Sequence, residues 1–343
     1  MAEPQVAPRI VFLIQGYDAP STRIRILNLL PHFRDAGFHA SVEVYPNSFC
    51  GWLRIVGSIS GADILVIQKR LPSFLDALFA KRLASRIVFD FDDSVWLRHR
   101  EGGTARPSRK LRDRFTHFLR RVDLAICGNP ILQEYLWQRC PATASVVIPS
   151  SVPAPETEVA KCAHALLRVG WVGTAINLPY LVAIEESLIE AHARVPFELV
   201  VICSAPPKFQ KFPHFRFVEW SAQTEYAEIA GFDAGIMPVA DNEHSRGKCA
   251  YKALQYMRCG VPVVASDVGI NREWIAGLGA GIVVKDDGWR DALVAVLSDA
   301  DARERFGAAG VTAIRGGFRV EDVARQYVEA FRKLLVPSTS ERA

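Results

Sequence analysis

Two lysines and a glutamine are spaced so that one helix could present them together. The stretch RGKCAYKALQYMRCGVPVVAS, residues 246–266, predicts a helix over 248–258 that leads into a buried strand. The polar side of that helix carries Lys248, Lys252 and Gln255 at i, i+4 and i+7. A helix N-terminus attracts anions through its free amides and dipole, and two ammonium groups strengthen that attraction. The pattern favours a diphosphate site, and the alternative interpretation is a solvated helix face.

The residues around these side chains fit the same helix. Gly247 allows a tight turn ahead of it, and Gly260 is the expected C′ residue. The side predicted to face the core holds Ala250, Leu254 and Met257.

A second group that could do chemistry is the set of carboxylates in DFDD, residues 90–93. An Asp-x-Asp can hold a divalent metal, but the diphosphate features lie far downstream, so we predict no metal site. Asp92 and Asp93 follow a predicted strand whose end we expect to face a cleft. The alternative is that Asp93 or Ser94 caps a helix.

The loop QGYDAPSTRIR, residues 15–25, joins the first predicted strand to the first predicted helix. Gly16 is its flexible residue and Ser21 is the predicted N-cap, so Arg23 and Arg25 fall in the first helical turn. Two interpretations remain open for these arginines: they contact an anion, or they solvate the surface.

The segment 106–121 carries seven Lys and Arg residues and one acid, Asp113, on a predicted amphipathic helix. Its charged face is either the solvated outside of a core-packing helix or a contact for anionic lipid headgroups. Just before it, His99 lies in a predicted loop over 96–107 and is a candidate base.

Short apolar runs bounded by turn residues predict strands throughout the chain, and helical periodicity fills the segments between them. The predicted strands cover 9–15, 63–68, 86–91, 123–128, 145–149, 168–173, 197–203, 214–218, 232–238, 261–266 and 281–284. The main predicted helices cover 21–36, 74–85, 111–122, 178–193, 289–298, 301–313 and 320–335. This alternation predicts an α/β protein with parallel sheets covered on both faces.

Length and composition predict two domains. At 343 residues the chain exceeds a usual single core, and the stretch PSSVPAPETEV, residues 149–159, reads as a linker. We expect two doubly wound Rossmann-like domains, over 1–152 and 153–318, that face each other across a cleft, with a helix over 319–336 packing back toward the first.

Composition also excludes several classes of protein. The seven cysteines include no CxxC pair or zinc spacing, so reduced thiols in a cytoplasmic protein are expected. No signal-peptide h-region or spanning apolar run is found. Motifs for dinucleotide binding, Walker-type phosphate binding and the hydrolase nucleophile elbow are absent. The net positive charge lies in residues 1–155, which hold 20 Lys and Arg against 13 Asp and Glu. This surplus is too small to indicate nucleic-acid binding.

The segment GKCAYKALQYMRCGVPVVASDVGINREWI, residues 247–275, resembles the donor-site segment of retaining glycosyltransferases of family 4, or glycosyl transferase group 1. Other pieces agree with that family in order and spacing: STRIRILNLLPHFRDAGF (21–38), ADILVIQKR (62–70), IVFDFDDSVW (87–96), ICGNPILQEYL (126–136) and VGWVGT (169–174). The resemblance covers almost the whole chain. It implies the two-domain GT-B fold, retention at the anomeric carbon and catalysis without a metal.

Many family members carry two glutamates eight residues apart, where this sequence has Gly247 and Gln255. A branch of the family shows the same Gly-Lys and Tyr/Phe-Lys variant. The second glutamate binds the ribose hydroxyls, a role that Gln255 can take with its amide. The family also places an Arg and a Lys after the first strand of the second domain, and residues 173–181 contain neither. The resemblance therefore assigns the diphosphate, and with it the catalytic role, to Lys248 and Lys252.

The remaining site residues implied by the resemblance fall into two groups. The donor-binding group comprises Gly173, Thr174, Arg246, Gly247, Gln255, Gly269 and Asn271. In the family the loop after the first strand approaches donor and acceptor, which implies a second group of Gly16, Arg23, Arg25 and His99. Next to them, Asp92 and Asp93 are expected to take part in catalysis by binding sugar hydroxyls or positioning an acceptor hydroxyl.

The hypothesis that follows is a retaining, metal-independent hexosyltransferase of polysaccharide biosynthesis. It would use no cofactor and no nucleic acid, and would move a sugar from a nucleotide diphosphate sugar to a carbohydrate or lipid-linked acceptor. We expect it in the cytoplasm, with contact between 106–121 and the inner face of the membrane as an additional prediction. The alternatives are a sugar-nucleotide epimerase or hydrolase on the same fold, and a non-catalytic protein that binds sugar nucleotides or activates a partner.

Overall fold

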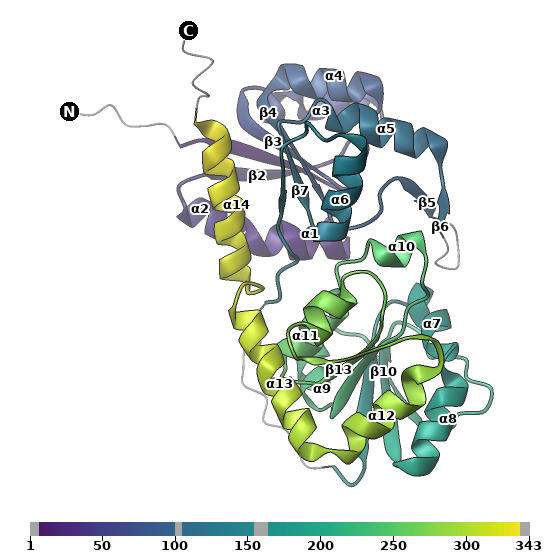
Figure 1. Cartoon of the computed structure of the whole chain (residues 1–343). Helices are drawn as coiled ribbons and strands as arrows, with labels where there is room; N and C mark the ends of the chain where they lie inside the picture. Colours follow the sequence, from purple (N-terminus) through teal and green to yellow (C-terminus); the bar gives the residue numbers. More distant parts are fainter. Residues whose placement is uncertain (1–6, 100–104, 154–163, 337–343) are drawn as a thin grey trace. The chain divides into compact units, whose positions relative to one another are not determined.

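The structure is a computed structural model that describes residues 7–99, 105–153 and 164–336, and these form two compact units (Figure 1). The first unit contains the described residues up to Arg98, Ala105–Pro153 and those from Val320 onward. The second contains His99 and the described residues up to Arg319. Each unit is built on one six-stranded parallel sheet, so the predicted α/β class with two Rossmann-like domains is confirmed.

The sheet of the first unit has the order β2-β1-β3-β4-β7-β8, and every pairing in it is parallel. Its strands are β1 (Arg9–Ile14), β2 (His39–Val44), β3 (Ala62–Gln68), β4 (Ala84–Phe91), β7 (Leu124–Cys127) and β8 (Ser145–Val147). β5 (Leu97–His99) and β6 (Ala105–Pro107) form a separate two-stranded sheet. The helical segments are α1 (Pro20–Arg25), η1 (Leu27–Leu29), α2 (Leu30–Asp35), α3 (Phe49–Ile59), α4 (Phe74–Leu83), α5 (Arg109–Leu119), α6 (Pro130–Arg139) and α14 (Val320–Leu335).

The last helix of the chain, α14, completes the core of the first unit. Figure 1 shows it, in yellow, lying along the helices coloured purple from the start of the chain. Phe331 of α14 lies 6.2 Å from Phe12 of β1 and 5.8 Å from Phe33 of α2, measured between ring centres. All three rings are fully buried, so the first sheet is covered on this side only when α14 has returned to it.

The sheet of the second unit has the order β11-β10-β9-β12-β13-β14, and it is also parallel throughout. Its strands are β9 (Leu167–Val172), β10 (Phe197–Cys203), β11 (Phe215–Glu219), β12 (Ala234–Met237), β13 (Val263–Ser266) and β14 (Gly281–Val284). The helical segments are η2 (Ala175–Asn177), α7 (Leu178–Val182), α8 (Glu185–Arg194), α9 (Glu225–Ala230), α10 (Glu243–Arg246), α11 (Tyr251–Arg258), η3 (Arg272–Ala276), η4 (Asp286–Gly288), α12 (Trp289–Ser298) and α13 (Ala300–Arg315). The order of the strands reverses between β9 and β12, and such a reversal opens a crevice at the carboxyl ends of the strands.

The predicted strands are all present. β2 was missed because its sequence, HASVEV, is not a continuous apolar run, and the prediction of a loop over 96–107 is wrong where β5 and β6 form. The predicted helix over 21–36 is wrong as a single element. Pro31 lies in its middle and has no N–H to donate, so α1 ends at Arg25 and α2 begins at Leu30. The helix predicted over 178–193 is likewise two helices, α7 and α8.

Part of the predicted linker over 149–159 is packed rather than extended over the surface, since Ser151 and Val152 are fully buried. The rest of that prediction, from residue 154, lies outside the described residues. Among the helices of the ranges given above, none combines the length and the apolar run that a bilayer crossing requires.

Candidate functional site

Tyr256 of α11 contacts both strands that flank the crevice of the second unit, β9 and β12. Gly170 of β9 pairs with Gly235 of β12, and a Cβ on Gly235 would lie 2.5 Å from the ring of Tyr256. The Tyr256 hydroxyl accepts a hydrogen bond from the N–H of Val172 at 3.0 Å and donates one to the carbonyl of Ile236 at 3.2 Å. α11 is thereby fixed against the two strands that flank the reversal.

Lys252 lies one turn before this tyrosine on α11, and its ammonium group faces the end of β9. Its Nζ atom is 4.5 Å from the centre of the Trp171 ring, and a Cβ on Gly173 would come within 2.7 Å of it. Burial, and to a smaller degree the charge of Lys248, lower the pKa of Lys252 to about 7. Within the described part of the chain, no carboxylate lies at ion-pairing distance from Lys252.

Lys248 reaches the same region from outside the helix. α11 begins at Tyr251, because Ala250 adopts a left-handed conformation with φ of 46° and interrupts the helix. The prediction of one helix over 248–258 with a polar stripe from its first turn is therefore wrong. The Lys248 Nζ atom lies 3.3 Å from Oδ1 of Asn177 and 5.6 Å from the centre of the Tyr180 ring.

Gln255 is buried, with 3% of its surface exposed, so the interpretation of a solvated helix face is wrong for this position. Its side-chain nitrogen is enclosed and donates to no atom of residues 7–99, 105–153 or 164–336. An amide enclosed without a partner costs stability, which is a common feature of ligand sites in the absence of the ligand.

Arg246 and Gly269 lie together at the rim of the site. The guanidinium of Arg246 donates to both carboxylate oxygens of Asp241, at 2.6 and 2.9 Å, and this pair is exposed. Gly269 has φ of 62°, and a Cβ there would lie 2.7 Å from the Arg246 carbonyl, so only glycine fits. Gly247 ends α10 in a turn ahead of α11, as predicted, with a φ of −81° that other residues can also adopt.

Two further predicted donor residues make hydrogen bonds inside the unit. Asn271 is buried and its Nδ2 donates to the carbonyl of Ser266 at 2.9 Å, which fixes the loop after β13. The exposed Thr174 accepts from Nδ2 of Asn177 at 2.9 Å, so it belongs to the group around Lys248.

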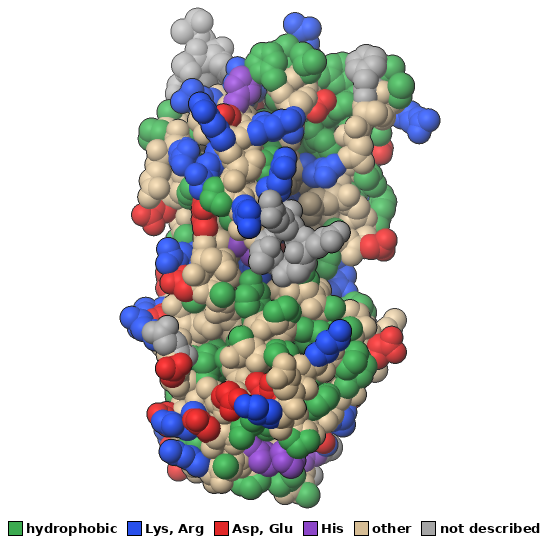
Figure 2. Space-filling model, turned by 90° about the vertical axis from the view of Figure 1, so that its right-hand side faces the viewer, with side chains coloured by type: hydrophobic (Ala, Val, Ile, Leu, Met, Phe, Trp, Pro, Cys, Tyr) green, Lys and Arg blue, Asp and Glu red, His purple; other side chains and the backbone are tan. Residues whose placement is uncertain are grey.

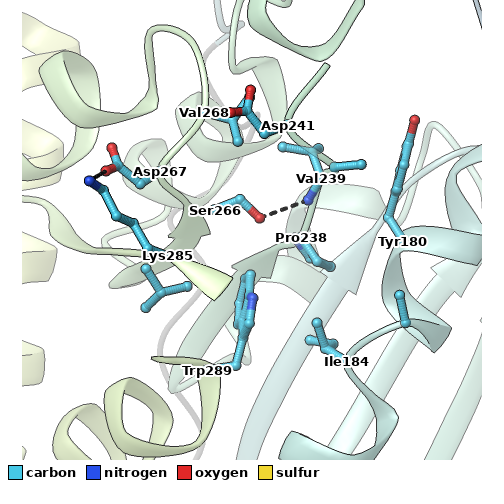
Figure 3. Close-up of a pocket in the computed structure, with 13 residues that line it drawn as sticks. Tyr180, Ile184, Pro238, Val239, Asp241, Ser266, Asp267, Val268, Lys285 and Trp289 are labelled. Carbon is cyan, nitrogen blue, oxygen red and sulfur yellow. Dashed lines mark hydrogen bonds and ion pairs between the residues drawn. The ribbon is translucent and has the colours of Figure 1, made fainter. Parts of the chain in front are cut away.

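A cavity of about 410 Å³ lies at the carboxyl ends of β12, β13 and β14 (Figure 3). Tyr180 forms part of its wall, and the same ring is approached by Lys248. The indole of Trp289 also lines the cavity, and its N–H donates to no described residue. Lys285 and Asp267 close one end as an ion pair. The cavity thus offers aromatic walls with polar groups between them.

In the first unit, Asp92 and Asp93 follow β4 and face Lys69, which follows β3. The Lys69 Nζ atom lies 3.0 Å from Oδ1 of Asp92 and 3.5 Å from Oδ2 of Asp93. Lys69 has φ of 56°, an unusual conformation for a side-chain-bearing residue. No helix follows Asp93, because the chain turns and enters β5, so the alternative of helix capping is wrong.

Arg25 has a structural role, and both interpretations of it as an anion contact or a surface residue are wrong. Only 1% of its surface is exposed, and its guanidinium pairs with Asp90 through Nε at 2.9 Å and Nη2 at 2.7 Å. Nη2 also contacts the hydroxyl of Tyr327 at 2.7 Å. Arg25 lies in the last turn of α1, not the first, and faces inward between β4 and α14.

The rest of the first loop shows less specialisation. Arg23 also lies in the last turn of α1, and the N-cap is Ala19 instead of Ser21, which is buried. A Cβ on Gly16 would touch nothing within 4 Å, so glycine is not required there. The prediction for the His99 side chain lies outside what the structure describes, although its backbone ends β5.

Lys248, Lys252, Gly173 and Thr174 therefore lie around one crevice. Arg25 has a structural role and belongs to no candidate site. Sequence reasoning missed Trp171, Asn177 and Tyr180, which line that crevice, and Lys69 in the first unit. The available signal was their position near the carboxyl ends of predicted strands, where parallel sheets bind ligands: Trp171 lies within 168–173, Asn177 and Tyr180 follow it, and Lys69 directly follows 63–68.

Comparisons with known proteins agree with this arrangement. Residues 163–299 match the family model described as glycosyl transferases group 1. No curated protein sequence matches the chain. Among solved structures, sucrose-phosphate synthase from Thermosynechococcus elongatus has a TM-score of 0.74 at 15% identity, over 96% of this chain and 100% of the other.

A glycosyltransferase from Rickettsia africae has a TM-score of 0.72 at 12% identity, over 96% of this chain and 99% of the other. HepE from Anabaena, in complex with UDP and glucose, has a TM-score of 0.67 at 14% identity, over 95% of this chain and 100% of the other. At these identities the likeness shows the fold alone, and the predicted GT-B fold is confirmed.

Proposed function

We propose that this protein is a glycosyltransferase that moves a sugar from a nucleotide diphosphate sugar to the hydroxyl of a carbohydrate or lipid-linked acceptor. The observation that carries the proposal is the pair of ammonium groups, Lys248 and Lys252, at the strand reversal of the second unit. The match to the glycosyl transferase group 1 model covers the same residues.

A diphosphate suits this crevice because it supplies the negative charge that Lys252 lacks. The lowered pKa of Lys252 means that its charged form is disfavoured in the empty site. A phosphate beside the ammonium group would restore the charge and raise that pKa. The N–H of Gly173 itself donates to the carbonyl of Ile202 at 3.0 Å, so the amide that we assign to a phosphate oxygen is that of Thr174, the next residue.

In the proposed reaction the bond between the anomeric carbon and the diphosphate breaks, and negative charge develops on the leaving oxygen. Ammonium groups already placed at that oxygen lower the barrier, since they need no reorganisation when the charge appears. We propose that Lys248 and Lys252 do this without a metal ion, and that the anomeric configuration is retained, as in the family that the sequence resembles.

We assign the cavity between Tyr180 and Trp289 to the sugar of the donor. Tyr180 is shared between the cavity and Lys248, so a sugar in the cavity would be joined directly to a diphosphate at the lysines. The free indole N–H of Trp289 and the carboxylates of Asp241 and Asp267 give partners for sugar hydroxyls. Gln255, whose amide nitrogen has no acceptor, would bind the ribose.

The acceptor is assigned to the first unit, at the carboxyl ends of β3 and β4. Asp92 and Asp93 are held there by Lys69, and a carboxylate oriented in this way can accept a hydrogen bond from an acceptor hydroxyl. The proposal requires the two units to face each other across a cleft during the reaction.

Thermal-shift measurements with a panel of nucleotides and nucleotide sugars test the proposal directly. UDP and UDP-glucose come first, because HepE from Anabaena was solved with each of them. Selective stabilisation by one nucleotide diphosphate sugar is expected, since a ligand that binds only the folded state raises its stability. If no nucleotide or nucleotide sugar shifts the transition, the proposal is wrong.

Product analysis then separates the proposed activity from its alternatives. Conversion of the donor without any acceptor would indicate an epimerase or hydrolase. Binding of the donor with no turnover, whatever acceptor is supplied, would indicate a non-catalytic sugar-nucleotide-binding protein.

A further inference from the structure

Three large apolar side chains on the first two turns of α4 are left in solvent. Phe74 is 52% exposed, Leu75 is 72% exposed and Leu78 is 42% exposed. Positions 74, 75 and 78 lie on one side of the helix, so these side chains form one apolar strip. Single exposed apolar residues are common, but a strip of three indicates a surface that contacts something.

The strip is bordered by the basic helix α5, which packs against α4. A hollow between the two helices is lined by Phe74 together with Arg109, Lys110 and Arg114. The guanidinium of Arg121 lies 5.5 Å from the centre of the Phe74 ring, and Arg109 is 97% exposed. Cations therefore stand directly beside the apolar side chains.

The charge on this surface is mainly positive. Segment 106–121 carries seven Lys and Arg residues, with Asp113 as its single acid. Figure 2 shows Lys and Arg side chains gathered on the face of the first unit that it presents, with hydrophobic side chains next to them. Self-repulsion among these cations costs stability, and an anionic partner would remove that cost.

We propose that the strip of Phe74, Leu75 and Leu78, together with the cations of α5, binds the surface of an anionic lipid bilayer. The apolar side chains would enter the boundary between headgroups and acyl chains, and the Arg and Lys side chains would contact the lipid phosphates. Nucleic acid would satisfy the cations but would leave the leucines in water. An anionic bilayer binds the cations and also covers the apolar side chains, so the charged and apolar features together favour a bilayer as the partner.

This surface lies outside the donor site of the second unit, so the inference goes beyond the proposed transferase activity. For the proposed transferase, membrane binding would bring the protein close to acceptors that are themselves carried by lipids. Binding to vesicles can be measured without any substrate, so failure of the lipid proposal leaves the transferase proposal intact, and the reverse also holds.

The test is flotation of the full-length protein with vesicles of phosphatidylcholine alone or mixed with phosphatidylglycerol. Binding is expected to the mixed vesicles at low salt, and to weaken as salt rises. The variant Arg109→Glu/Lys110→Glu should lose ~10-fold or more of that binding, because two attractions become repulsions. The variant Leu75→Ser/Leu78→Ser should lose a similar amount, because it removes the inserted apolar groups.

Matched controls come from the second unit, where Leu166 is 49% exposed and Arg305 is 67% exposed. Leu166→Ser and Arg305→Glu should leave flotation unchanged. All four variants should keep the melting temperature of the wild type, which shows that they are folded.

Three results would overturn the proposal. The first is an absence of binding to anionic vesicles, or equal binding to neutral ones. The second is sedimentation showing that Leu75→Ser/Leu78→Ser turns an oligomer into a monomer, which would make the strip an interface between copies of the chain. The third is binding to RNA that the charge variant abolishes and the leucine variant leaves intact.

Discussion

The ammonium group of Lys252 lies over the indole ring of Trp171, 4.5 Å from its centre, where the strand order of the second unit reverses. An aromatic ring attracts a cation weakly, so it can hold the lysine in place without neutralising it. The charge stays available to a phosphate, which a carboxylate partner in the same position would have prevented.

Replacing Lys252 by alanine should therefore remove most of the turnover with little effect on folding. Loss of one preorganised charge at a leaving group typically costs about 10²–10³ in rate, so kcat should fall by that factor. Lys211→Ala is the control, since that lysine is 64% exposed in the same unit. Steady-state kinetics with near-normal kcat for Lys252→Ala would contradict the proposed role.

The pKa of Lys252, at about 7, makes stability depend on pH in a defined direction. In the unfolded chain a lysine has a pKa of about 10.4, so between the two values the unfolded state binds more protons. The contribution of this group to stability should then rise with pH from about 7 to about 10. Donor affinity should change the other way, falling above pH ~7 as the free protein loses the ammonium charge.

The variant Lys252→Met isolates this effect. At neutral pH it should be more stable than the wild type, because no charge is buried, and the difference should shrink as the pH rises. Thermal unfolding of both proteins across this range is the measurement, and a difference that stays constant with pH would exclude the lowered pKa.

Gly173 offers a test of the crevice that removes no charged group. A Cβ at this position would lie 2.7 Å from Nζ of Lys252 and 2.6 Å from the ring of Trp171, so Gly173→Ala should displace both. Gly16→Ala is the matched control after the first strand of the other unit, where a Cβ meets nothing within 4 Å. Calorimetry should show ~10-fold or greater loss of donor affinity for the first variant. Equal affinities would place the donor elsewhere.

Some features of the fold and the site could be predicted from the sequence, and others could not. Continuous apolar runs such as RIVFLI and FELVVIC predicted β1 and β10, because buried parallel strands need no polar side. The left-handed conformation of Ala250 could not be predicted, since alanine has no preference for it. Because of this conformation the helix begins after Lys248. The burial of Arg25 was equally hidden, because its partners Asp90 and Tyr327 are 65 and 302 residues away.

The assignment of the cavity to the donor sugar can be tested by filling it. Ile184 lines the cavity and has no part in the lysine group, so Ile184→Trp should occupy the space without disturbing the phosphate contacts. Affinity for the nucleotide sugar should fall by ~10-fold or more, while affinity for the nucleotide diphosphate alone should be kept. An equal loss for both ligands would assign the cavity to the nucleoside instead.

The buried pair of Arg25 and Asp90 should dominate the stability of the first unit. Arg25→Met leaves Asp90, which is fully buried, without its cation, and breaking a buried pair in this way costs about 3–5 kcal/mol. Lys333→Met is the control, because its ion pair with Glu329 on α14 is exposed and should contribute little to stability.

The double variant Arg25→Met/Asp90→Leu should regain much of the loss, because no charge then remains buried. Denaturant unfolding of the wild type, the single variant and the double variant measures both steps. Since Tyr327 of α14 contacts the same pair, the unfolding of α14 should follow that of the first sheet in every variant. A single variant as stable as the Lys333→Met control would show that the pair is not what joins α1, β4 and α14.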